Sequence, residues 1–175
     1  HYEKFKEYKQ LKMIKTYLEY INYVKGKDGK LYNFVTESKI IDNKNWSEDA
    51  HGRALWALGY LISLNEIPND FRDKAEKIFL EALPVMSTIN SSRAIAFAIS
   101  GLYFYNKSKN SEYIIKNIKK LAESLVSLYE NNAQNDWKWF EQYLAYSNSK
   151  LSEALFYAYE LTKEQKYLDT ATESL

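Results

Sequence analysis

The sequence predicts an all-α fold built from helical hairpins. Only five Gly and two Pro occur among 175 residues, a low count that disfavours a β fold with many turns. Helical hydrophobic periodicity covers most of the chain, and helices of two kinds alternate along it. We therefore expect about seven helices in one helical domain, residues 1–175, which we interpret as a fragment of a longer chain.

The first kind of predicted helix is apolar on nearly all sides. A helix of this kind has to be surrounded by other parts of the protein. Three such inner helices are expected, at 54–62, 94–105 and 151–161. Their spacing of roughly 40–57 residues is too uneven for a tetratricopeptide or ankyrin array.

The second kind is amphipathic, with one apolar stripe and one polar face. In the segment 70–83, for example, Phe71, Ala75 and Ile78 fall on one stripe. These outer helices would shield the inner ones, as in an α/α toroid. About seven helices make up roughly half of a six-hairpin ring, so we expect a partial ring. The outer helices are expected at 2–24, 70–83, 111–129 and 164–175.

Capping residues support these helix starts. Ser47, followed by Glu48 and Asp49, is a favourable N-cap with an acidic first turn. The other predicted caps are Asn69 or Asp70 and Asn110 or Ser111.

Charge and composition exclude several functions. The net charge is +1, from 24 basic and 23 acidic side chains, so no strong field would attract nucleic acid or an anionic membrane. No apolar run reaches the length of a membrane span. The absence of cysteine excludes disulfides and thiolate catalysis but does not fix the compartment, for which we favour the cytoplasm.

No cofactor or metal site is predicted. The segment KGKDGK lacks the spacing of a phosphate-binding loop, and neither a nucleophile elbow nor a dinucleotide fingerprint occurs. His51, the only internal histidine, has no visible metal-ligand partners in the sequence. We expect it to be a polar core residue or to hydrogen-bond a substrate.

The unusual residues are concentrated where the chain enters each inner helix. These entry segments are 28–53, 87–93 and 136–150, and in a toroid they gather at one end of the central cavity. Together they hold three of the four tryptophans and His51. The candidate site is therefore expected at this end.

The first two entries carry charged residues with two interpretations each. Glu48 and Asp49 could cap a helix, with Asp49 paired to Arg53 four residues on, or one of them could act as a general base or sugar-hydroxyl acceptor. Arg53 and Arg93 each open an inner helix, where a guanidinium needs a carboxylate or a ligand. Ion pairs with Asp49 or Glu141 explain these arginines as well as substrate binding does.

The third entry, DWKWFEQYLAYSN, places aromatic rings beside hydrogen-bonding groups. A pyranose has apolar C–H faces and a rim of hydroxyls, so this combination is typical of carbohydrate binding. Aromatic packing at a hairpin junction is the alternative. The candidate stacking residues are Trp137, Trp139 and Tyr146, and the candidate hydrogen-bonding residues are Glu141 and Asn148.

Glu141 together with Glu48 or Asp49 could form an acid and base pair for glycoside cleavage. A separation of about 5–5.5 Å between such carboxylates would indicate retention, and about 6.5–9.5 Å inversion.

Three segments together resemble the six-hairpin glycosidase-like superfamily. They are DGKLYNF with WSEDAHGRALWALG, then SSRAIAFAISGL, then WKWFEQYLAYSNSKLSEAL, over residues 28–160. The segments resemble in particular a bacterial and archaeal group often found beside, or fused to, sugar-processing enzymes and glycosyltransferases. The resemblance implies an α/α toroid and a carbohydrate ligand, while the superfamily includes hydrolases, lyases, phosphorylases and epimerases.

The resemblance also implies a set of site residues. The sequence departs from the family pattern at Ala145, where a threonine is expected. The matching positions are Asp28, Asn33, Glu48, Asp49, His51, Gly52, Arg53, Trp56, Arg93, Trp139, Glu141, Tyr146, Asn148 and Glu153.

Three functional hypotheses follow. The first is a glycosidase-like domain that binds a glycan at the mouth of the helical cavity and cleaves it with the carboxylate pair. The second is a non-catalytic module that binds sugar or docks onto a partner glycosyltransferase, and the third is a structural scaffold. A second copy of the chain is a further predicted partner, which would complete the ring.

Overall fold

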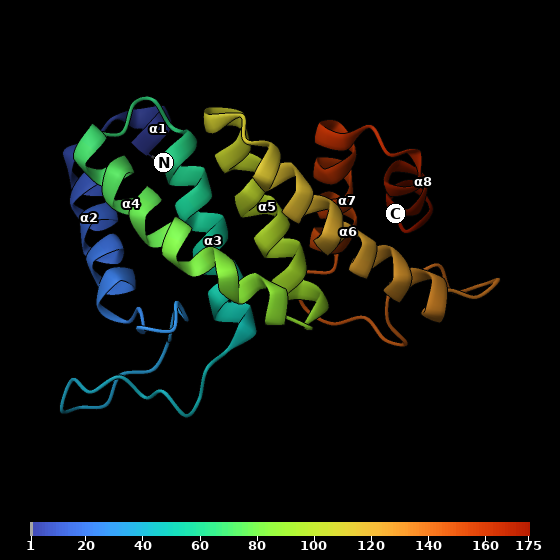
Figure 1. The fold of residues 1–175 in the computed structure, drawn as a ribbon, viewed down its shortest axis with the longest axis horizontal. Coiled ribbons are helices and arrows are strands. Elements are labelled where there is room, and N and C mark those ends of the chain that lie inside the picture. Colours follow the sequence, from blue (N-terminus) through green and yellow to red (C-terminus); the bar gives the residue numbers. More distant parts are fainter. Residues whose placement is uncertain (1) are drawn as a thin grey trace.

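The helices lie in two layers in the computed structural model, which describes residues 2–175 (Figure 1). Within that range the chain is all-helical and has no strand, as predicted. The inner layer consists of α3 (Glu48–Ser63), α5 (Ser92–Lys109) and α7 (Ser149–Thr162). The other elements are α1 (Tyr2–Phe5), α2 (Tyr8–Tyr23), α4 (Asn69–Ala82), the 3-10 helix η1 (Leu83–Thr88), α6 (Glu112–Asn132) and α8 (Gln165–Glu173).

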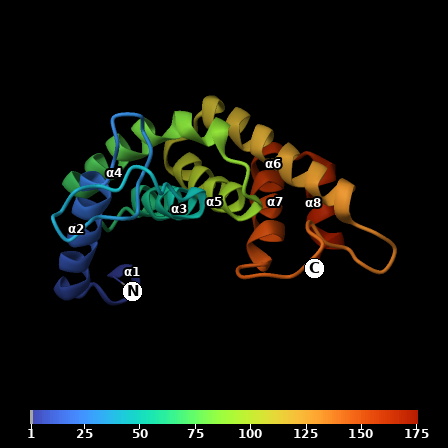
Figure 2. The ribbon, with the colours of Figure 1, turned by 90° about the horizontal axis from the view of Figure 1, so that it is seen from below.

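The two layers curve into an open arch (Figure 2). Helices α4 and α6 follow the convex side, while α3, α5 and α7 lie along the inner side. Helices α1 and α2 stand at one end of the arch and α8 at the other. The alternation of inner and outer helices agrees with the sequence, whereas closure into a toroid stays a prediction.

The core is continuous from one end of the arch to the other, from Leu18 of α2 to Ala171 of α8. Its tightest part is the contact between α3 and α5, where backbone meets backbone. A Cβ atom on Gly101 of α5 would lie 2.5 Å from the carbonyl oxygen of Leu55 in α3. The glycine therefore sets how closely these two inner helices approach.

Several boundaries differ from the sequence prediction. The helix expected at 2–24 is broken into α1 and α2, because Lys6 adopts a left-handed backbone with φ +53°. The inner helices are longer than their apolar runs, since they also include the polar residues at both ends. In α2 only Leu18 is fully buried, so this helix is attached to the arch by one edge.

The predicted caps have mixed outcomes. The Ser47 hydroxyl accepts a hydrogen bond from the Ala50 N–H at 3.2 Å, which confirms that cap. Asn69 is instead the first residue of α4, after Pro68, and neither it nor Asp70 is the cap. Ser111 occupies the N-cap position of α6 without a capping bond from its side chain.

Helices α2 and α3 are joined by a long irregular segment. Two short antiparallel bridges, between Lys25 and Leu31 and between Val35 and Ile41, fold it into turns. None of the helices within residues 2–175 is both long enough and apolar enough to span a membrane.

Candidate functional site

Arg93 connects the second and third entry segments. Its side chain, only 6% exposed, forms an ion pair with Glu141 at 2.7 Å, which agrees with the ion-pair interpretation of this arginine. The same guanidinium donates to the Asn148 side chain at 2.9 Å and to the backbone carbonyl of Tyr146. A buried guanidinium with these partners fixes the chain that leads into α7.

Glu141 is held on both carboxylate oxygens. Arg93 Nη1 lies 2.8 Å from Oε1 and 2.7 Å from Oε2, and the Ser92 hydroxyl donates to Oε1 at 2.6 Å. Both oxygens therefore already accept hydrogen bonds from α5.

Asp49 joins the first entry to the third. Arg53 donates from Nε to Asp49 Oδ2 at 2.7 Å, which confirms the pair predicted four residues apart. The Tyr146 hydroxyl donates to the other oxygen, Oδ1, at 2.8 Å. Burial and then this hydrogen bond raise the pKa of Tyr146.

Glu48 joins the first entry to the second. Its Oε2 atom accepts hydrogen bonds from the backbone N–H groups of Asn90 at 2.9 Å and Ser91 at 2.7 Å. The carboxylate thus secures the backbone at the start of α5. All three predicted catalytic carboxylates lie at the same end of the inner helices, and each is bound by groups of the protein.

The aromatic residues of the third entry have separate roles. Trp139 is 8% exposed and packs edge-on against Phe140, with ring centroids 5.3 Å apart. Trp137 is partly buried and donates its indole N–H to the Glu141 carbonyl at 2.6 Å. Tyr146 is 54% exposed and lies beside Arg93, whose guanidinium is 5.0 Å from the ring centroid. Of the three predicted stacking residues, Tyr146 alone is well exposed.

His51 is a core residue, which agrees with one of its two interpretations. Its side chain is fully buried, and Nδ1 accepts a hydrogen bond from the Leu31 N–H at 3.1 Å. The Trp46 ring meets it edge-on at 5.6 Å. Burial lowers the pKa of His51 to about 4. The histidine attaches the long segment before α3 to the arch.

Because of this buried histidine, the free energy of unfolding is expected to depend on pH. An unfolded histidine titrates near pH 6.5 and folded His51 near pH 4, so the unfolded state binds the proton more readily. The stabilisation is complete above pH 6.5 and falls by about 3 kcal/mol as the pH drops to 4. Urea denaturation at pH 7.0, 5.5 and 4.5 measures this loss. His51→Gln should show a shallower pH dependence, and an equal dependence in both proteins would contradict the assignment.

Asp28 and Asn33 lie in the long segment between α2 and α3. Asp28 accepts hydrogen bonds from the Lys30 N–H at 3.1 Å and from the Tyr32 hydroxyl at 3.0 Å. The Asn33 carbonyl accepts a hydrogen bond from Tyr20 at 3.2 Å. In the part of the chain that the structure describes, neither contacts Arg93, Glu141 or Asp49, so their predicted sugar-binding role stays a prediction.

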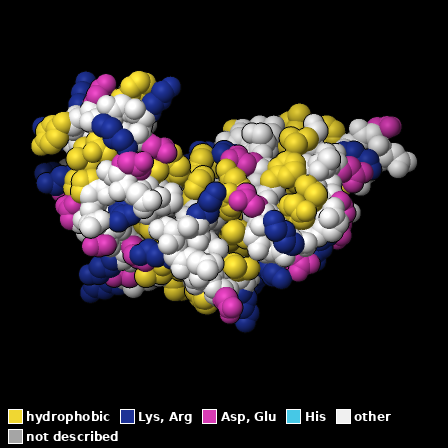
Figure 3. All heavy atoms as spheres, turned by 90° about the horizontal axis from the view of Figure 1, so that it is seen from above, with side chains coloured by type: hydrophobic (Ala, Val, Ile, Leu, Met, Phe, Trp, Pro, Cys, Tyr) yellow, Lys and Arg dark blue, Asp and Glu magenta, His cyan; other side chains and the backbone are white. Residues whose placement is uncertain are grey.

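The inner helices also present a row of aromatic and charged side chains on the concave face, which we call the concave strip. Figure 3 shows the molecule hollowed on one side, with hydrophobic side chains beside acidic and basic ones along the hollow. The concave strip consists of Arg53, Trp56 and Tyr60 of α3, Phe104 of α5, and Tyr146, Lys150, Glu153 and Tyr157 in and before α7, with fully buried Phe97 of α5 packed beneath it.

One half of the concave strip is centred on Trp56. Its ring stacks on buried Phe97, with centroids 5.7 Å apart and planes 7° from parallel. The Arg53 guanidinium lies 4.2 Å from the Phe97 centroid, and Lys150 Nζ lies 4.0 Å from that of Trp56. Lys150 is in turn paired with Glu153 at 2.5 Å.

The other half is centred on Phe104. Its ring meets Tyr60 at 5.0 Å and Tyr157 at 5.8 Å, both nearly edge-on. The Tyr157 hydroxyl donates to Glu153 at 2.8 Å, which links the two halves. Burial and this hydrogen bond raise the pKa of Tyr157. The arrangement offers aromatic surface next to charged hydrogen-bonding groups on three helices.

Half of the concave strip is absent from the residues that the sequence predicted. Arg53, Trp56, Tyr146 and Glu153 are among the predicted positions, but Tyr60, Phe104, Lys150 and Tyr157 were not expected. The spacing held a signal, because Trp56 and Tyr60 follow Arg53 by three and seven residues and so share its helix face.

No metal centre is expected at this site. Nowhere in residues 2–175 do three or more histidine, aspartate or glutamate side chains gather as potential metal ligands.

Comparison of the chain with protein-family models, with curated proteins and with solved structures finds no match in any of the three.

Proposed function

We propose that this chain is a carbohydrate-binding helical domain that holds a glycan along the concave strip. The observation that carries the proposal is the juxtaposition of partly exposed Trp56 and exposed Tyr146 with two charge pairs, Asp49–Arg53 and Lys150–Glu153. Aromatic faces suit the C–H faces of a sugar ring, and charged side chains on both sides can pair with its hydroxyls.

Binding without cleavage agrees best with the hydrogen bonds of the carboxylates. Glycoside hydrolysis needs one carboxyl group free to protonate the leaving oxygen and another free to act as a base or nucleophile. Glu141 is engaged by Arg93 and Ser92, and Glu48 by two backbone N–H groups. We therefore favour the non-catalytic hypothesis over hydrolysis. Docking to a partner glycosyltransferase and ring completion by a second copy remain further proposals.

Replacing Trp56 with alanine is expected to weaken glycan binding about tenfold or more, because it removes the largest aromatic face of the concave strip. A glycan array identifies a glycan that the unmodified protein binds. Calorimetric titration with that glycan then measures the dissociation constants of the unmodified protein and of each variant. Tyr113→Ala is the matched control, since Tyr113 is 61% exposed on the outer helix α6. Equal affinity for Trp56→Ala and Tyr113→Ala would contradict the proposal, as would an array that retains no glycan.

The same glycan also tests for cleavage. We expect no new reducing ends when the protein is incubated with it. Turnover that disappears in Glu141→Gln, with binding unchanged, would instead establish the acid and base pair.

A further inference from the structure

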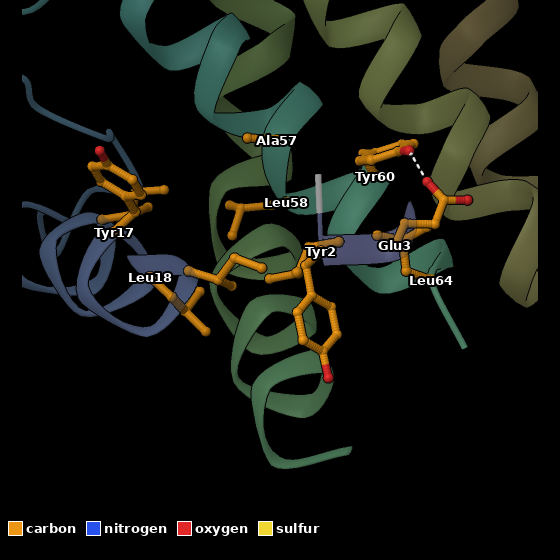
Figure 4. A pocket seen from close by; sticks show the side chains of 11 residues that line it. Tyr2, Glu3, Tyr17, Leu18, Ala57, Leu58, Tyr60 and Leu64 are labelled. Carbon is orange, nitrogen blue, oxygen red and sulfur yellow. Dashed lines mark hydrogen bonds between the residues drawn. The ribbon is translucent and has the colours of Figure 1, made fainter. Parts of the chain in front are cut away.

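An apolar pocket of about 280 Å³ lies where α1, α2 and α3 meet (Figure 4). Helix α2 contributes Ile14, Leu18 and Ile21, α3 contributes Leu58 and Leu61, and Leu64 follows α3 directly. On this side of α3, Leu58 is buried whereas Ala57 and Tyr60 stay exposed. The sequence pattern does not predict a site here.

The pocket has the size and lining of a site for a small apolar group. A dry cavity of about 150 Å³ lined by aliphatic side chains is large enough to bind benzene. This pocket is nearly twice that volume and therefore has room for an aryl group or an alkyl chain of moderate length. Burial of such a group would be favourable in proportion to the apolar area removed from water.

Tyr60 connects the pocket to the concave strip. It lines the pocket and at the same time packs edge-on against Phe104, 5.0 Å away. Its hydroxyl donates to the Glu3 carboxylate at 2.6 Å, a hydrogen bond at the rim that is drawn in Figure 4. Arg53 and Tyr60 are seven residues apart on α3, which is roughly 10 Å along the helix. One ligand can therefore lie on the concave strip and reach into the pocket.

We propose that this pocket binds the alkyl or aryl group of a glycoside whose sugar part lies on the concave strip. The inference rests on the proposed sugar binding and adds the substrate class, an amphiphilic glycoside. The pocket supplies aliphatic contacts to the alkyl or aryl group, and the charged pairs of the concave strip hydrogen-bond the sugar. Tyr60 lies between these two parts of the site.

The test uses octyl glycosides of glucose, galactose, mannose and N-acetylglucosamine below their micellar concentrations, the matching methyl glycosides, and 1-octanol. Binding is followed by NMR of isotope-labelled isoleucine and leucine methyl groups. At least one octyl glycoside should shift the Ile14, Leu18 and Leu61 methyl signals. It should bind about tenfold or more tightly than its methyl counterpart and than 1-octanol, and tenfold corresponds to about 1.4 kcal/mol.

Ala57→Phe tests the pocket without touching the core. Ala57 lines the pocket and is exposed, so a phenyl ring there occupies the space intended for the ligand. The variant should bind the octyl glycoside no more tightly than the methyl glycoside. Thr172→Phe adds the same ring at an exposed position of α8, at the other end of the arch, and should bind as the unmodified protein does.

The outcomes separate this inference from the proposed function. Methyl glycosides that bind through Trp56 without any gain from the octyl chain would overturn the inference and leave sugar binding intact. If 1-octanol binds as tightly as every octyl glycoside, the pocket takes apolar groups without any contribution from the sugar. That result would also overturn the inference. If octyl glycosides leave the pocket signals unchanged while Ala57→Phe alters the sedimentation coefficient, the pocket is instead an interface between copies.

Discussion

Replacing Arg93 with methionine is expected to lower the free energy of unfolding by about 3–5 kcal/mol. The Arg93 side chain is 6% exposed, and its removal leaves the partly buried Glu141 carboxylate, 18% exposed, without its cation. The substitution also removes the hydrogen bonds that hold Asn148 and the carbonyl of Tyr146. Urea denaturation followed by circular dichroism measures the change.

Arg53→Met is the matched control, because it breaks an ion pair of similar length that is far more accessible. The Arg53 side chain is 43% exposed, so this loss should cost only about 0.2–1 kcal/mol. The double variant Arg93→Met, Glu141→Leu should recover part of the loss, since no unpaired charge stays buried. Equal destabilisation by Arg93→Met and Arg53→Met would show that the Arg93 network is unimportant for stability.

Replacing Gly101 with alanine is expected to destabilise the protein by about 3 kcal/mol or more, the upper part of the range for overpacked cores. The added methyl group would lie 2.5 Å from the Leu55 carbonyl oxygen and 2.9 Å from the Trp56 nitrogen. These are backbone atoms, so α3 and α5 would have to separate. In an unconstrained helix the same change is stabilising by about 0.5–1 kcal/mol. The sign of the change in the free energy of unfolding therefore tells whether the two helices are in close contact at Gly101.

The melting temperature measures this effect along the series Gly101→Ala, Gly101→Ser and Gly101→Val, which should show a progressive decrease. Ser124→Ala, on the exposed face of α6, should stay within about 0.5 kcal/mol of the unmodified protein. A melting temperature that rises for Gly101→Ala would contradict the close approach of the two helices.

The sequence predicted the helical class and the alternation of inner and outer helices, and it offered ion pairs as one of two interpretations of Arg53 and Arg93. These features follow from local rules, since periodicity reports burial and a buried guanidinium requires a carboxylate. The structure accordingly pairs Arg53 with Asp49 and Arg93 with Glu141. The break at Lys6 was not predicted, because it depends on one backbone angle rather than on the hydrophobic pattern.

The site was harder to predict than the fold. Inner helices are apolar on nearly all sides, so their pattern does not show which face is left open on the concave side. Tyr60 and Tyr157 therefore resembled core residues, while Trp139 resembled a binding residue although it is 8% exposed. In an irregular entry segment no periodicity separates exposed rings from buried ones, and tertiary packing decides between them.

Lys150 covers the Trp56 ring, so a ligand that stacks on this ring has to displace it. Its ammonium group lies 4.0 Å from the Trp56 centroid and is held there by Glu153. A ligand that stacks on this ring would have to displace the cation, whose side chain is 20% exposed, and forgo an attraction of about 1–2 kcal/mol. Groups that offer only weak apolar contact are therefore rejected in favour of those that also give the displaced ammonium a new hydrogen-bond acceptor. If a glycan binds here as proposed, Lys150 would compete with it until one of the sugar hydroxyls accepts a hydrogen bond from the ammonium group.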